Sequence, residues 1–115
     1  MKQVLSIQSS VAAGFVGNTI AGPVLTALGQ HPMLVDTVML AAHPGYGKRA
    51  GGAVPDDILA AVLDGILSLT DTSGITIVTS GYLGSASQVS AIAAVVDGWR
   101  DATGGTYILD TVLGD

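Results

Sequence analysis

Two kinds of apolar pattern alternate along this chain. Short, nearly continuous apolar runs typical of buried strands occupy residues 4–7, 33–42, 75–79 and 106–109. Between them, apolar residues recur at helical spacing over residues 20–28, 58–66 and 89–99. The order β-α-β-α-β-α-β predicts parallel strands joined by right-handed helical crossovers. We therefore expect an α/β fold, with a parallel sheet flanked by helices, in a single domain over residues 1–115.

Local signals predict where the helices begin. Asn18 is a candidate N-cap of the first helix, which should begin near residue 20 so that Pro23 lies in its first turn. Pro55 suits the first position of the second helix. Ser85-x-x-Gln88 has the form of a capping box before the third helix. The glycine-rich residues 43–52 are predicted to form a loop.

Composition narrows the class of protein. Hydrophobic residues make up 49% of the chain and charged residues 11%, which excludes a disordered chain. A net charge of −5 argues against nucleic-acid binding, and the absence of cysteine excludes disulfides and thiol catalysis. No apolar run approaches the roughly 18 residues of a membrane span, and the first residues do not resemble a signal peptide. We expect a soluble, cytoplasmic protein with no membrane or nucleic-acid partner.

Polar residues follow each predicted strand, at the edge where open parallel sheets bind ligands. In chain order they are Gln8, Ser9 and Ser10, then His43, Pro44, Gly45 and Tyr46, then Ser80, Gly81 and Tyr82, and finally Asp110 and Asp115. Each has a structural alternative: serines form turns, a lone histidine is often structural, and an aspartate after a strand is a common turn former. The pattern predicts a binding edge and leaves the ligand open.

Five segments give this edge a more specific interpretation. They are Leu5-Ser6-Ile7-Gln8-Ser9, Gly14-Phe15-Val16-Gly17-Asn18, His43-Pro44-Gly45-Tyr46-Gly47, Ser80-Gly81-Tyr82-Leu83-Gly84-Ser85 and Asp110-Thr111-Val112-Leu113-Gly114-Asp115. In order and approximate spacing, they resemble the amino-terminal portion of pyridoxal kinases, the vitamin B6 branch of the ribokinase-like superfamily. The resemblance extends over the whole chain and implies the first half of a ribokinase-like fold, the substrate-binding half.

The resemblance implies a kinase that transfers the γ-phosphate of ATP to the 5′-hydroxyl of pyridoxal, pyridoxine or pyridoxamine in pyridoxal 5′-phosphate salvage. Seven positions match vitamer-binding residues of the family: Ser9, Val16, Leu40, His43, Pro44, Gly45 and Tyr82. Asp110 and Asp115 match aspartates that face the ATP phosphates, and Asp115 is the candidate Mg²⁺ residue. ATP, Mg²⁺ and a monovalent cation are the expected cofactors, and a homodimer is the expected assembly.

The chain departs from the family at several positions of these motifs. Ser10 replaces a common histidine, Leu40 an aromatic residue, Ala42 an asparagine, Pro44 a threonine and Thr111 a proline. These changes bear on vitamer affinity and choice rather than on the fold. The family's G-x-G-D segment, whose aspartate is the general base, does not occur. We therefore expect no catalytic residue in this chain and no activity from the 115 residues alone.

The missing segment indicates a part of a longer kinase. We expect the chain to be a truncated product or an incomplete sequence of such a kinase, with an open sheet edge that makes it dimerise or aggregate. The alternatives are a stand-alone B6-vitamer-binding module, an inactive remnant, and a relative that phosphorylates hydroxymethylpyrimidine. The sequence argues against a flavodoxin-like signalling receiver, because such a domain needs an acidic pair after the first strand and this chain has Ser9 and Ser10 there.

Overall fold

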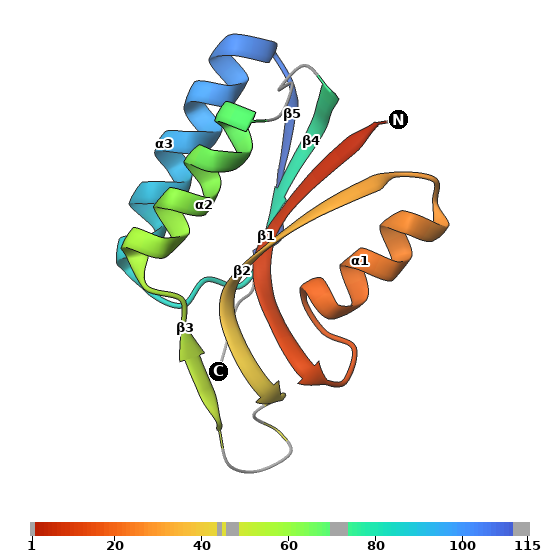
Figure 1. Cartoon of the computed structure of the whole chain (residues 1–115), viewed down its shortest axis with the longest axis vertical. Helices are drawn as coiled ribbons and strands as arrows, with labels where there is room; N and C mark the ends of the chain where they lie inside the picture. Colours follow the sequence, from red (N-terminus) through yellow and green to blue (C-terminus); the bar gives the residue numbers. More distant parts are fainter. Residues whose placement is uncertain (1, 44, 46–48, 70–73, 112–115) are drawn as a thin grey trace.

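The computed structural model describes residues 2–43, 45, 49–69 and 74–111 (Figure 1). It confirms the α/β fold, with one strand more than predicted. The elements are β1 (Gln3–Ala13), α1 (Asn18–Ala27), β2 (His31–Ala42), β3 (Gly51–Ala53), α2 (Asp56–Leu69), β4 (Ile75–Ser80), α3 (Ala86–Thr103) and β5 (Thr106–Leu109).

The strands form one mostly parallel, five-stranded sheet in the order β3-β2-β1-β4-β5. β1 lies at the centre and pairs in parallel with β2 and β4, and β4 pairs in parallel with β5. β3 is the extra strand, and it runs antiparallel to β2 with Val38 opposite Ala53 and Leu40 opposite Gly51. The prediction of a loop throughout residues 43–52 is therefore wrong at its end, because Gly51 and Gly52 pair with the long second strand.

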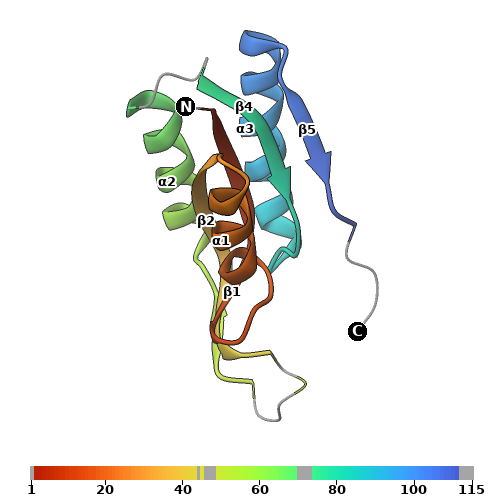
Figure 2. The same cartoon turned by 90° about the vertical axis from the view of Figure 1, so that its right-hand side faces the viewer.

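Helices cover the two faces of the sheet unequally (Figures 1 and 2). α1 alone packs against β1 and β2 on one face, while α2 and α3 lie together on the other. The apolar core lies between the sheet and this helix pair. Its buried members are Leu5, Ile7, Val35, Leu59, Leu63, Ile75, Val78, Ile92, Val96 and Trp99. The nearly continuous apolar runs of the sequence thus supply much of this core.

The first strand is much longer than its apolar run predicts. It continues to Ala13, so Ser9 and Ser10 lie within β1 and do not form the turn that the sequence suggested. The register with β2 shifts between Gln8 and Ser10, where β2 contains one residue more than β1. The apolar run of β1 ends at Ile7 because residues 8–10 are polar, while the backbone pairing continues to Ala13.

One predicted helix start is corrected, and a second is confirmed without its expected capping bond. Gly17, not Asn18, is the N-cap of α1, and its carbonyl accepts from the N–H groups of Ile20 and Ala21 at 3.2 and 3.0 Å. The helix begins at Asn18, so Pro23 lies inside it and not in the first turn. Ser85 does precede α3, but its side chain makes no capping hydrogen bond.

The predicted apolar face of α2 is only partly buried. Leu59 and Leu63 are almost completely inaccessible to solvent, whereas Ile58 and Val62 are exposed. Within the part of the chain that the structure describes, no helix is both long and apolar enough to cross a membrane.

Candidate substrate-binding edge

The sequence-predicted site residues that the structure describes lie along the carboxyl ends of the parallel strands (Figure 1). Ser9 lies in β1 and Val16 in the loop that follows it, whereas Leu40 lies near the end of β2. The others follow their strands closely: His43 and Gly45 come after β2, Tyr82 after β4 and Asp110 after β5. Pro44 and Asp115 lie outside the described residues. All of these residues lie in or after parallel strands, and the most distant pair, Ser9 and Asp110, is 101 positions apart in the sequence.

The loop between β1 and α1 packs directly on Ser9. Gly17 has φ 57° and ψ −138°, and a Cβ placed on it would lie 2.0 Å from the Ser9 carbonyl oxygen and 3.0 Å from Ser9 Oγ. Only glycine allows this approach, because any side chain would overlap the strand. The contact fixes Val16, the residue before Gly17, beside Ser9, with the Val16 side chain partly exposed at the edge.

The Asn18 side chain holds the start of α1 against β1 and β2. Its side chain is buried, its Oδ1 accepts a hydrogen bond from Ser6 Oγ at 2.7 Å, and its Nδ2 donates to the Val35 carbonyl at 3.1 Å and to Asp36 Oδ1 at 2.9 Å. A longer bond of 3.3 Å joins Nδ2 to the Gln8 carbonyl, just before Ser9. One amide therefore connects α1 with both β1 and β2, next to the register shift opposite Ser9.

The segment that carries Tyr82 is held by its backbone. Thr37 Oγ1 donates to the Tyr82 carbonyl at 2.6 Å, and the Gly81 N–H donates to the Ile7 carbonyl at 3.0 Å. The Tyr82 side chain remains 41% exposed. An aromatic ring that is held by its main chain and open to solvent is available to pack against a flat ligand.

The end of β2 contributes one apolar and one polar group. Leu40 is half-buried and lies opposite Val11 in β1 and Gly51 in β3. The side chain of His43 is exposed, and its Nδ1 accepts from the Gly45 N–H at 3.0 Å. A neutral imidazole whose Nδ1 accepts carries its proton on Nε2, which can then donate to an oxygen of a ligand.

Asp110 extends the edge beyond the last strand. Its N–H donates to the Ser80 carbonyl at 2.8 Å, which continues the pairing of β4 with β5, and the residue is exposed. Within the described ranges, no three His, Cys, Asp or Glu side chains gather closely enough to hold a metal ion. The described residues therefore do not make a complete Mg²⁺ site.

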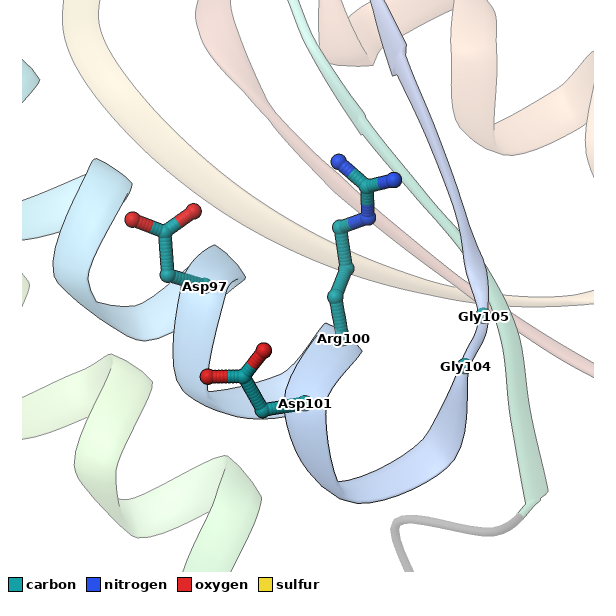
Figure 3. A pocket seen from close by; sticks show the side chains of 5 residues that line it. All are labelled: Asp97, Arg100, Asp101, Gly104 and Gly105. Carbon is teal, nitrogen blue, oxygen red and sulfur yellow. The ribbon is translucent and has the colours of Figure 1, made fainter.

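A hollow of about 460 Å³ lies at the opposite end of the sheet, where α3 ends and β5 begins (Figure 3). Asp97, Arg100, Asp101, Gly104 and Gly105 line it. None of them is a predicted site residue, and the hollow is remote from the carboxyl ends of the strands. Its two carboxylates and one guanidinium make it a polar surface feature, distinct from the binding edge.

Comparison with known proteins decides what this edge resembles. The pyridoxine/pyridoxal/pyridoxamine kinase of Bordetella avium is 34% identical over 113 residues, and a pyridoxal kinase of Actinobacillus succinogenes is 36% identical over 116 residues. These alignments cover 97% and 99% of this chain. This chain is related to the pyridoxal kinases. No family model matches it.

Solved pyridoxal kinases share the fold as well as the sequence. The enzyme from Entamoeba histolytica superposes with a TM-score of 0.93 at 28% identity over 99% of this chain. The enzyme from Leishmania donovani, solved with ADP and pyridoxamine, gives 0.90 at 30% identity over the full chain. The chain spans 38% and 40% of the two curated pyridoxal kinases, and 41% of each solved enzyme.

The sequence predicts candidate site residues at this edge, but it does not identify three buried polar residues that lie beside them in the structure. Thr37 interrupts an apolar strand, and Asn18 and Gln88 were interpreted as local helix signals. All three are buried and make hydrogen bonds between different elements. The position of Thr37 inside an apolar run was a sequence signal for a buried polar role. The roles of Asn18 and Gln88 had no such signal, because their hydrogen-bond partners lie in other elements and are set by the tertiary fold.

Proposed function

We propose that this chain supplies the vitamer-binding part of a pyridoxal kinase, which transfers the γ-phosphate of ATP to the 5′-hydroxyl of a B6 vitamer. The observation that carries the proposal is the superposition of this sheet on solved pyridoxal kinases, and it is supported by the positions of Ser9, Val16, Leu40, His43 and Tyr82 in or after its strands. Related structures that contain ADP with pyridoxamine or with pyridoxine support the same ligands here.

The groups at the edge suit a small aromatic ring with polar substituents. The Ser9 hydroxyl can both donate to and accept from the polar atoms of a pyridine. The Val16 side chain and the exposed Tyr82 ring offer apolar surface to its two faces, and His43 Nε2 offers a donor to an oxygen substituent. Pro44 and Gly45 complete the proposed vitamer-binding set.

The proposed phosphate side is less complete within this chain. Asp110 and Asp115 are proposed to face the ATP phosphates, with Mg²⁺ and a monovalent cation as further cofactors of the whole enzyme. Because the described residues gather no three metal-binding side chains, we derive no step through Mg²⁺. The 115 residues also lack a G-x-G-D segment, so we propose that they bind the vitamer without phosphorylating it. A cytoplasmic homodimer is the proposed form of the whole kinase.

Binding is best tested with pyridoxine and the glycine amides of the chain. Pyridoxine has no aldehyde, so it cannot form an imine with the two lysines and imitate specific binding. In a glycine-selective ¹⁵N spectrum, five described glycines report on the edge: Gly14, Gly17, Gly45, Gly81 and Gly84. Glycines remote from the edge serve as internal controls: Gly29, Gly65, Gly98, Gly104 and Gly105.

We expect saturable shifts confined to the edge glycines, and a clear loss of affinity in Ser9→Ala. Uniform shifts, or binding that does not depend on Ser9, would contradict the proposal. Trp99 fluorescence is a poor reporter, because this side chain is buried and packs against Gly105 at the opposite end of the sheet.

Two further measurements separate the kinase from the alternatives. An assay with ATP and pyridoxal should give no phosphorylated product from the 115-residue chain. Turnover would contradict the proposal that these residues bind the vitamer without phosphorylating it. A reading frame that continues past the codon for Asp115 into a G-x-G-D segment supports a kinase, whereas a stop codon there favours a vitamer-binding module or a remnant. Competition between pyridoxine and hydroxymethylpyrimidine tests the remaining alternative.

A further inference from the structure

Gln88 is a fully buried amide in the first turn of α3 whose hydrogen bonds all leave its own helix. Its Oε1 accepts from the Gly84 N–H at 2.7 Å, and its Nε2 donates to the Thr37 carbonyl at 3.1 Å and to the Val54 carbonyl at 3.0 Å. Both amide hydrogens and the oxygen are therefore satisfied. Burial of an amide is unfavourable unless such bonds form, so the side chain specifies where these three backbone groups lie.

The partners of Gln88 belong to three separate segments. Gly84 ends the segment that carries Tyr82, Thr37 lies in the middle of β2, and Val54 follows β3. The segment from Gly81 to Gly84 is thus fixed at three points, because Gly81 is bonded to β1, Tyr82 to Thr37 Oγ1 and Gly84 to Gln88.

Close packing makes the position of this segment sensitive to small displacements. A Cβ placed on Gly84 would lie 2.7 Å from Ala53 Cβ and 2.9 Å from Val38 Cγ2. The segment therefore lies directly against the β2–β3 pair, and β2 leads on to His43. Gln88 consequently connects the two parts of the edge that present Tyr82 and His43.

We propose that Gln88 is a positioning residue that sets the place of the Tyr82 ring relative to the β2–β3 pair, and so the affinity for the vitamer. This inference rests on the proposed function. Gln88 offers no exposed group to a ligand, because its side chain is completely buried, and it acts only through the backbone that it holds.

Gln88→Met is the informative substitution because it keeps the length and apolar stem of the side chain. It leaves the Gly84 N–H and the Val54 carbonyl without their buried partner, whereas the Thr37 carbonyl keeps the Val54 N–H at 2.8 Å. Unpaired buried groups regain hydrogen bonds only if water enters or the segment moves. The expected result is displacement of the Tyr82 segment while α3 remains folded.

The control is Val96→Ala, which removes buried apolar atoms from the same helix two turns further on and touches no part of the edge. We expect Gln88→Met to weaken pyridoxine binding about fivefold or more, because this is the change in affinity that corresponds to the free energy of one lost hydrogen bond. Faster amide exchange at Gly84 and Gly81, whose N–H groups are hydrogen-bonded in the parent, should accompany it. Val96→Ala should lower stability without either effect. Pyridoxine affinity within twofold of the parent in folded Gln88→Met would overturn the proposal.

Two provisions keep the outcome interpretable. If Gln88→Met does not fold, Thr37→Val removes the bond to the Tyr82 carbonyl with little change of shape, and it should weaken binding in the same way; unchanged affinity would overturn the proposal. If the parent chain does not bind pyridoxine, the proposed function fails. The amide exchange of Gly81 and Gly84 in the ligand-free variants then tests positioning alone, and unchanged exchange would refute it.

Discussion

Replacing Gly17 with alanine tests how tightly the loop before α1 is held against Ser9. The φ and ψ of Gly17, 57° and −138°, form a combination that residues with side chains rarely adopt, at a cost of about 1–3 kcal/mol. The new methyl group would lie 2.0 Å from the Ser9 carbonyl oxygen and 2.8 Å from its carbon, so the strand or the loop must move. Such overpacking adds about 1–3 kcal/mol. We therefore expect Gly17→Ala to lower the free energy of unfolding by about 2–6 kcal/mol, a large share of the roughly 5–15 kcal/mol of a typical domain.

Two other glycines separate the backbone contribution from the steric one. Gly29 has φ 80° with no atom within 4 Å of an added Cβ, so Gly29→Ala should cost only the roughly 1–2 kcal/mol of a left-handed backbone. Gly98 lies inside α3 with open space around it, and Gly98→Ala should stabilise the chain by about 0.5–1 kcal/mol. Urea unfolding followed by circular dichroism measures all three. The reasoning is refuted if Gly17→Ala destabilises the chain no more than Gly29→Ala does.

Four other predictions follow from single contacts. Asn18→Leu should lower the free energy of unfolding by about 1–3 kcal/mol, because the buried carbonyls and hydroxyl that it now binds lose their partner; a neutral effect would contradict this. Gly105→Ala should cost about 1–3 kcal/mol, since a Cβ there would lie 2.3 Å from the Trp99 ring, and near-ultraviolet circular dichroism should report the displaced indole. Tyr107→Phe removes the hydroxyl that is hydrogen-bonded to Ser80 and should cost about 1 kcal/mol in the same urea assay, whereas a gain in stability would argue against that bond. The exposed edge strand β5 should make the isolated chain associate, so a stable monomer in size-exclusion chromatography would contradict the expectation.

The general fold could be predicted from the sequence because its signals are local and redundant. Each parallel strand contains a short apolar run, and each helix repeats apolar residues at a spacing that only a helix can bury on one side. The second half of β1 and the short strand β3 have no such signal. The first begins with three polar residues, Gln8, Ser9 and Ser10, and in the second two of three residues are glycine. Both segments are stabilised by pairing with β2, and this pairing cannot be inferred from the residues that neighbour them in the sequence.

The two amides illustrate why the inner side of the site was not predicted. Asn18 and Gln88 occupy the positions in their helices at which polar residues commonly cap the backbone, so a local interpretation assigned them to caps. In the fold, Gly17 caps α1 through its backbone, and the Asn18 side chain is free to bond across two strands. Gln88 retains one bond close to its helix, to Gly84, and uses its two donors elsewhere. A buried carbonyl of another element competes successfully with the local partner because both would otherwise be unsatisfied.

This division between exposed and buried residues predicts how substitutions should act across the edge. His43 and Tyr82 are exposed and Ser9 is half-buried, so changing them should remove the proposed contacts with a ligand and little of the core. Asn18 and Gln88 are buried, and each holds the backbone next to such residues through hydrogen bonds. Variants of the first group should therefore lose vitamer affinity at nearly constant stability, whereas variants of the second group should lose both together. A binding edge built from several strand ends requires this coupling, since the exposed groups keep their mutual positions only through the polar contacts beneath them.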